Sequence, residues 1–133
     1  MSKRSKLLHG QLKELKDNGW IVNQSDAIYF NEGSERLDHL HAKTVTAKVL
    51  KDQGYRVDTE VTMPDGEVDV LGYSEQDMIV VECESNPDSN TFSSKLNRYV
   101  HDQPPREMFW IDVDAVPGNI GEAYDFITAE LFE

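Results

Sequence analysis

The sequence predicts an α/β domain in which a mixed β-sheet is flanked by helices. Three observations support this prediction: helix-like and strand-like segments follow one another along the chain, residues 78–83 form a nearly continuous apolar run, and no internal repeat is present. Such an apolar run is typical of a strand covered on both faces, so we assign it to the sheet centre. The 133 residues fit one domain, with a core over 34–133 and a small N-terminal helix-hairpin extension over 1–33.

The extension is expected to begin with an amphipathic helix. Leucines recur at helical spacing over residues 3–17, with lysines on the other side, and Gly19 is expected to stop the helix. Two apolar runs follow, at 20–22 and 27–30, separated by a polar turn. This pattern predicts a hairpin.

The core is expected to open with a helix from Ser34 to about Gln53, ended by Gly54. The pattern then changes to alternation of apolar and polar residues, which predicts a strand over 55–61. The remaining elements are expected in this order: a turn at 63–66, a strand at 67–73, a turn at 74–77, the central strand at 78–83, a helix at 91–101, a break at Pro104-Pro105, a strand at 108–113 and a helix at 119–131.

The net charge of −12 is unusual for a protein that binds nucleic acid, because phosphate binding usually rests on Lys and Arg. The charge is uneven, however: residues 1–56 hold ten basic and seven acidic side chains, whereas residues 57–133 hold three and eighteen. An acidic surface also keeps a protein soluble at high salt, which indicates a halophilic source. An ordinary acidic protein whose partner is not DNA is the alternative. The candidates for phosphate contacts are Lys3, Arg4, Lys6, Lys13 and Lys16.

The cysteine content and the apolar runs limit the class of protein. Cys83 is the single cysteine, which excludes an intramolecular disulfide and a cysteine-based zinc or iron-sulfur site. The first residues lack the apolar run of a signal peptide, and no stretch approaches the roughly 18 apolar residues of a membrane span. We therefore expect a cytoplasmic protein.

Three acidic residues stand at the ends of two neighbouring predicted strands. Glu82 and Glu84 are two residues apart, so in a strand they point to the same face, and the hairpin places Asp69 opposite them. Three carboxylates at short range repel one another unless a cation lies among them, and Mg²⁺ or Mn²⁺ requires oxygen ligands. The spacing predicts a metal site made of Asp69, Glu82 and Glu84. Alternatively, Glu67, Asp69 and Glu84 simply alternate onto a solvent face of an acidic protein.

An Asp followed after twelve residues by Glu-x-Glu, between two strands, resembles the PD-(D/E)xK nuclease superfamily over residues 35–113. The resemblance implies a restriction-endonuclease-like or Holliday-junction-resolvase-like core, with a helix, three antiparallel strands, a second helix and a further strand. It implies that Asp69 and Glu82 bind Mg²⁺ or Mn²⁺. It also implies hydrolysis of phosphodiester bonds in duplex or branched DNA.

The chain departs from the family pattern at the third motif position, which is normally lysine. Glu84 stands there instead. Some relatives are similar in having Glu at this position, and others supply a lysine from the neighbouring helix. Lys95 is the candidate for such a lysine, because it shares a helical face with Tyr99 four residues on. The alternative is that Lys95 is an ordinary solvated helix residue.

The predicted helix before the first strand carries a polar stripe. Glu35, His39 and Lys43 recur every four residues and so line one face. Relatives in the superfamily point polar side chains from this helix at the site, which implies that His39, with Glu35 behind it, contributes to catalysis. Stripes of this composition are also common on solvent-exposed helices.

Two functions from different classes remain open. The first is a metal-dependent DNA endonuclease, which as a homodimer would have two sites for two cuts. In it, Glu84 or Lys95 positions the attacking water. The second is a catalytically inactive nuclease-like domain that acts as a DNA-binding or protein-interaction module, which the Lys-to-Glu change and the acidic second half favour. A third reading is that the fold is only the scaffold of an accessory protein in transport or recombination.

Overall fold

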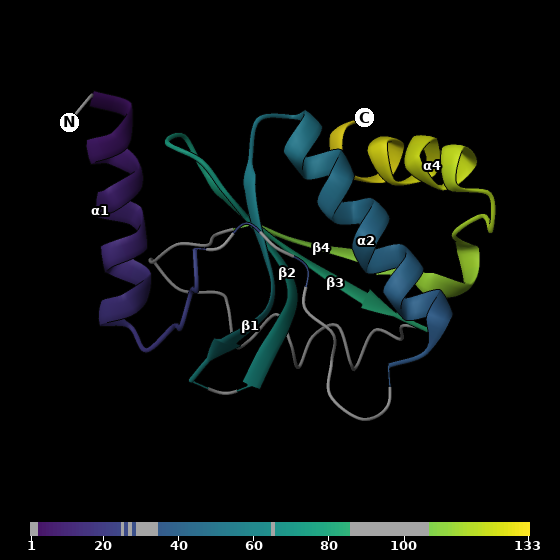
Figure 1. The fold of residues 1–133 in the computed structure, drawn as a ribbon, viewed down its shortest axis with the longest axis horizontal. Helices are drawn as coiled ribbons and strands as arrows, with labels where there is room; N and C mark the ends of the chain where they lie inside the picture. The colour runs from purple at the N-terminus through teal and green to yellow at the C-terminus, as the bar shows by residue number, and fades with distance from the viewer. Residues whose placement is uncertain (1–2, 25, 27, 29–34, 65, 86–106) are drawn as a thin grey trace.

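A four-stranded mixed sheet forms the centre of the molecule, in the order β1-β2-β3-β4 (Figure 1). The first three strands are antiparallel neighbours, and β4 runs parallel to β3. This computed structural model describes residues 3–24, 26, 28, 35–64, 66–85 and 107–133. The strands are β1 (Arg56–Met63), β2 (Gly66–Tyr73), β3 (Met78–Glu84) and β4 (Glu107–Asp112).

Helices lie on both sides of the sheet. In Figure 1, α2 and α4 lie together on one side, whereas α1 stands apart at the other end of the molecule. A short 3₁₀ turn, η1, leads from β4 towards α4, which begins at the capping side chain of Asn119. The helices are α1 (Lys3–Asp17), α2 (Leu37–Asp52), η1 (Val113–Ala115) and α4 (Ile120–Phe132).

Two separate apolar clusters, one on each face of the sheet, make the core. Successive residues of β3 alternate between them: Val81 packs in the cluster with α2 and α4, and Val80 in the cluster with α1 and Trp20. Both valines are fully buried. The apolar run at 78–83 is therefore a strand covered on both faces, as predicted.

The α/β class, the mixed sheet and the flanking helices are confirmed, with two differences in detail. The first concerns the start of α2, predicted at Ser34. It begins at Leu37, because Arg36 is extended (φ −77°, ψ 154°) and Glu35, just before it, turns its carboxylate towards Lys43. The predicted stop is confirmed at Gly54, whose φ of +96° is a conformation that glycine adopts without strain.

The second difference is a contact that the sequence did not predict, between residues 20–22 and β1. Ile21 forms a β-bridge with Thr62 of β1, and most of the run at 27–30, its predicted hairpin partner, lies outside the described residues. Gln24 and Asp26 have φ values of 58° and 54°, which turn the chain away from an extended path. Their N–H groups donate to the carboxylate of Asp58, at 2.7 and 3.1 Å, and this buried acceptor explains the turn.

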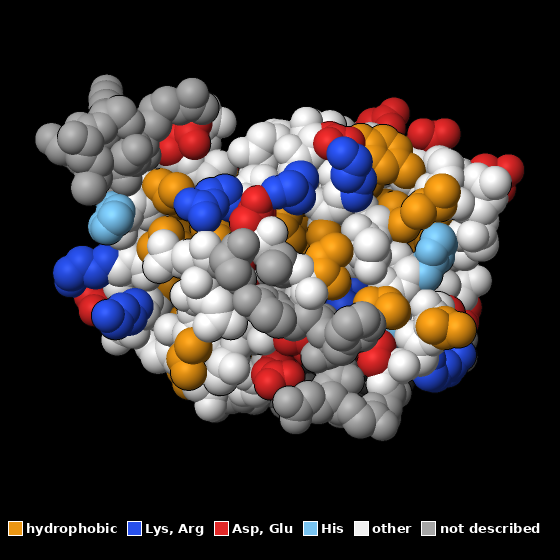
Figure 2. All heavy atoms as spheres, in the orientation of Figure 1, with side chains coloured by type: hydrophobic (Ala, Val, Ile, Leu, Met, Phe, Trp, Pro, Cys, Tyr) orange, Lys and Arg blue, Asp and Glu red, His pale blue; other side chains and the backbone are white. Residues whose placement is uncertain are grey.

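Charges are unevenly spread over the surface. Figure 2 shows acidic side chains along its upper right edge, over α4, and basic side chains on the left, over α1, and in the upper middle. No helix among the described residues is long and apolar enough to cross a membrane. The predicted helix at 91–101, with Lys95, lies outside the described residues.

Candidate active site

The first two strands change faces at the same level of the sheet. Val57 packs on the α2 side and Val61 on the α1 side, although strand residues four apart normally share a face. Glu60, between them, has a φ of 52°, a left-handed conformation that costs about 1–2 kcal/mol in a residue with a side chain. The strand is thus strained at Glu60, and such strain is common at functional sites.

Asp69 lies opposite this irregular position. The register pairs Thr59 with Val70 and Val61 with Val68, so Glu60 and Asp69 face each other across the β1-β2 hairpin. On the other side, the β2-β3 ladder ends at the pair Val70 and Val81. Asp69 is therefore placed where β2 loses regular pairing with both of its neighbours.

The carboxylate of Asp69 takes the place of the missing backbone pairing. Its Oδ2 accepts a hydrogen bond of 2.8 Å from the N–H of Cys83 in β3. Glu82, the preceding residue of β3, is buried, and its carboxyl group interacts with Asp69 and helps to lower the pKa of Asp69. We call these two neighbouring carboxyl groups the acid pair.

His39 of α2 connects this acid pair to the helix. Its Nδ1 lies 2.6 Å from Oε2 of Glu35, and its Nε2 lies 3.4 Å from Oδ1 of Asp69. Asp69 and then Glu35 favour the charged ring, against the effect of burial, and raise the pKa of His39 to about 9. At neutral pH, His39 is thus an imidazolium held between two carboxylates.

Lys43, one turn further along α2, is fully buried. Its Nζ donates to both oxygens of Glu35, at 2.9 and 2.7 Å, and to Glu60 at 3.0 Å. Burial raises the pKa of Glu60 above its ordinary value, although the Lys43 ammonium acts in the opposite direction. Lys43 is the cation that makes the burial of these acids tolerable.

The environment of Asp69 favours its ionised form. Burial opposes ionisation, but hydrogen bonds from His39 and from the Cys83 N–H, together with the interaction with Glu82, outweigh it, so the pKa of Asp69 lies below its ordinary value. The arrangement places an ionised carboxylate, a second, buried carboxyl group and an imidazolium within one small volume.

Four of the candidate site residues lie close together in the structure: Glu35, His39, Asp69 and Glu82. Glu84, the last residue of β3, is half-buried, and Lys95 lies outside the described residues. Over the described ranges, no group of three or more His, Cys, Asp or Glu side chains is arranged to hold a metal ion.

Sequence reasoning missed Glu60 and the buried role of Lys43. The stripe on α2 pointed to Lys43, but only as one of three residues on a helix face. No sequence signal marks Glu60, because alternation along residues 55–61 places it on the face away from α2. Its left-handed backbone reverses that placement.

Comparison of the chain with protein-family models, with curated proteins and with solved structures finds no match in any of the three.

Proposed function

We propose that the chain is a metal-dependent DNA endonuclease with a restriction-endonuclease-like core. The observation that carries this proposal is the acid pair of Asp69 and Glu82, at the end of the β2-β3 ladder. Two neighbouring carboxyl groups that are largely shielded from solvent are costly unless a cation compensates them. A divalent cation bound by both would turn the pair into a metal site.

The donor set fits Mg²⁺ or Mn²⁺. Mg²⁺ commonly takes only one or two carboxylates, keeps several waters and completes its shell with substrate phosphate oxygens. Asp69 and Glu82 supply that number of carboxylates, both from one sheet, and Glu84 is a candidate for a further contact from the end of β3. His39 now contacts Asp69 and would give up that contact.

When bound, the metal would polarise the scissile phosphate and lower the pKa of a bound water. The chain supplies the other functions. His39, oriented by Glu35, carries a positive charge that would hold a phosphate oxygen. Glu84 would take the proton of the attacking water, in the position where the superfamily has lysine. Lys95 remains a proposed source of a substrate-facing cation.

One observation favours the second candidate, a nuclease-like module that does not cleave. Lys43 and His39 already compensate Glu35, Glu60 and Asp69 without a metal. A site balanced by its own cations can be retained for stability alone. In that case the domain binds DNA or a protein partner, and a dimer has no catalytic role.

The test is cleavage of supercoiled plasmid and of a branched oligonucleotide with Mn²⁺, at low and at molar salt. Asp69→Asn and Glu82→Gln keep the size of each side chain and should abolish cleavage. Glu67→Gln is the matched control, because Glu67 is an exposed acid on the same strand as Asp69. Titration of Mn²⁺ into each protein provides a second readout, since only the first two variants should lose binding.

Cleavage that survives in both site variants would exclude the proposed ligands. A wild-type protein that is folded, binds no Mn²⁺ and cleaves neither substrate at any salt would favour the non-catalytic module.

A further inference from the structure

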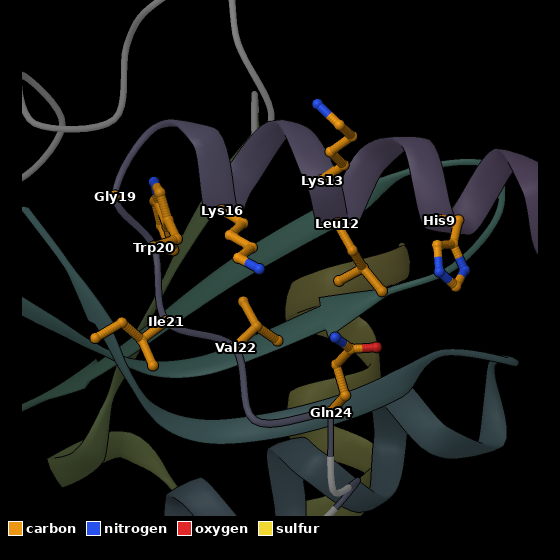
Figure 3. Close-up of a pocket in the computed structure, with 9 residues that line it drawn as sticks. All are labelled: His9, Leu12, Lys13, Lys16, Gly19, Trp20, Ile21, Val22 and Gln24. Carbon is orange, nitrogen blue, oxygen red and sulfur yellow. The ribbon is translucent and has the colours of Figure 1, made fainter.

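A second feature of the chain, on the α1 side of the sheet, is a groove of about 610 Å³ between α1 and residues 19–24 (Figure 3). Leu12 points into it from α1 and Val22 from the facing segment, which also carries Gln24. The groove is held open by two fixed walls. Leu12 anchors α1 in the core, and the bridge from Ile21 to Thr62 anchors the other wall to β1.

The polar side chains of this groove are basic. His9, Lys13 and Lys16 line it, and none of the described residues in its lining is acidic. Figure 3 shows the Lys16 amine and the His9 ring directed into the groove, whereas Lys13 points away from it. Lys13 pairs with Asp17 at 2.8 Å, but Lys16 has no ion pair with any described residue. In a chain of net charge −12, this groove favours an anionic occupant.

The other large hollow, about 660 Å³ between α2 and α4, makes a useful contrast. Two lysines line it as well, but Lys48 pairs with Asp52 and Lys51 with Asp26. Those charges are already matched within the chain. The α1 groove is therefore the better candidate for binding an external anion.

The groove also offers apolar surface to an occupant. Ile21 is 59% exposed at the wall, and Leu12 and Trp20 contribute further apolar atoms to the lining. A nucleic-acid strand combines these properties, since its phosphates are anionic and its bases and sugars present apolar faces. A simple inorganic anion would use Lys16 but not Ile21.

We propose that the groove between α1 and residues 19–24 binds a single-stranded segment of nucleic acid. This inference rests on the proposed function: the DNA substrate would have an unpaired strand, and the groove would bind that strand at a place separate from the acid pair. The hollow has the volume of a small-molecule site, so an unpaired nucleotide can enter it, whereas a duplex can contact only its rim. The preferred substrate is then DNA with an unpaired strand.

The experiment measures binding of fluorescein-labelled oligothymidylate and of the corresponding duplex, by anisotropy in EDTA, so that cleavage plays no part. Lys16→Glu should weaken binding of the single strand about tenfold, the loss of one charge-assisted contact. The slope of log K against log salt should fall by about 0.7 for each phosphate contact removed. Ile21→Ala should also weaken binding, although it leaves the charge unchanged.

Lys48→Glu is the matched control, because it reverses one exposed lysine in the other hollow and changes the net charge equally. Equal losses in Lys16→Glu and Lys48→Glu would overturn the proposal in favour of diffuse charge attraction. Tighter binding of the duplex, or displacement of the strand by polyglutamate at equal charge concentration, would also overturn it.

The two proposals fail separately. If cleavage requires Asp69 but Lys16→Glu binds the single strand as tightly as the wild type does, the groove proposal is wrong and the nuclease proposal stands. Selective loss of binding in Lys16→Glu, without any cleavage by the wild type, keeps the groove as the binding site of a non-catalytic module.

Discussion

The Nζ atom of Lys43 lies 2.7 and 2.9 Å from the two carboxylate oxygens of Glu35, and the lysine has no exposure to solvent. Glu35 in turn fixes His39, so this buried ion pair connects the centre of α2 to the acid pair in the sheet. The stability of the candidate site thus depends on a residue that substrate does not reach.

Lys43→Met should lower the free energy of unfolding by about 3–5 kcal/mol, because it leaves the buried carboxylates of Glu35 and Glu60 without their cation. Urea denaturation measures the change. Lys48→Met is the control: that lysine is exposed and pairs with Asp52 on the same helix, so its loss should cost less than about 1 kcal/mol. Equal effects in the two variants would contradict the structural role of Lys43.

The stability of the metal-free protein should fall as pH rises through the titration of His39. The pKa of its ring is raised from 6.5 to about 9, first by Asp69 and then by Glu35. Folding therefore favours the protonated ring, so the contribution is complete below pH 6.5 and is lost as the pH approaches 9. Urea midpoints in EDTA across this window should decline for the wild type and change less for His39→Gln. Parallel declines would show that another group is responsible.

Asp58→Ala should destabilise the protein by about 1–3 kcal/mol, because it leaves the N–H groups of Gln24 and Asp26 without their acceptor. Since residues 19–24 form a wall of the groove, the same change should weaken binding of single-stranded DNA. Asp114→Ala, at an exposed acid in η1, serves as the control and should stay within about 0.5 kcal/mol. Hydrogen exchange at residues 20–24 would locate the effect.

Two glycines near the groove should respond to alanine in opposite directions. Gly19 has a φ of +89°, and a Cβ there would lie 2.9 Å from Cγ of Pro64, so Gly19→Ala should destabilise the protein by 1 kcal/mol or more, about the cost of a left-handed residue. Gly10 is inside α1 with no atom within 4 Å of an added Cβ, so Gly10→Ala should stabilise by about 1 kcal/mol. Thermal unfolding of both variants tests the prediction.

The sequence by itself determined the elements whose signals are local. The apolar run at 78–83 identified the central strand, Gly54 identified the end of α2, and the order of segments led to the α/β class. The neighbourhood of Asp69 and Glu82 could also be predicted, because the turn at 74–77 makes their two strands adjacent. These features follow from backbone preferences and periodicity, which act over a few residues.

Only the tertiary structure decided how the buried charges and the backbone strain of the site are compensated. The left-handed backbone of Glu60, the burial of Lys43 and the pairing of Ile21 with Thr62 depend on contacts between segments far apart in the chain. A strained residue or a buried charge is unfavourable locally and persists only when the surrounding packing and ion pairs compensate it. That compensation comes from the three-dimensional arrangement of α2, β1 and β2, so no local sequence pattern contains it.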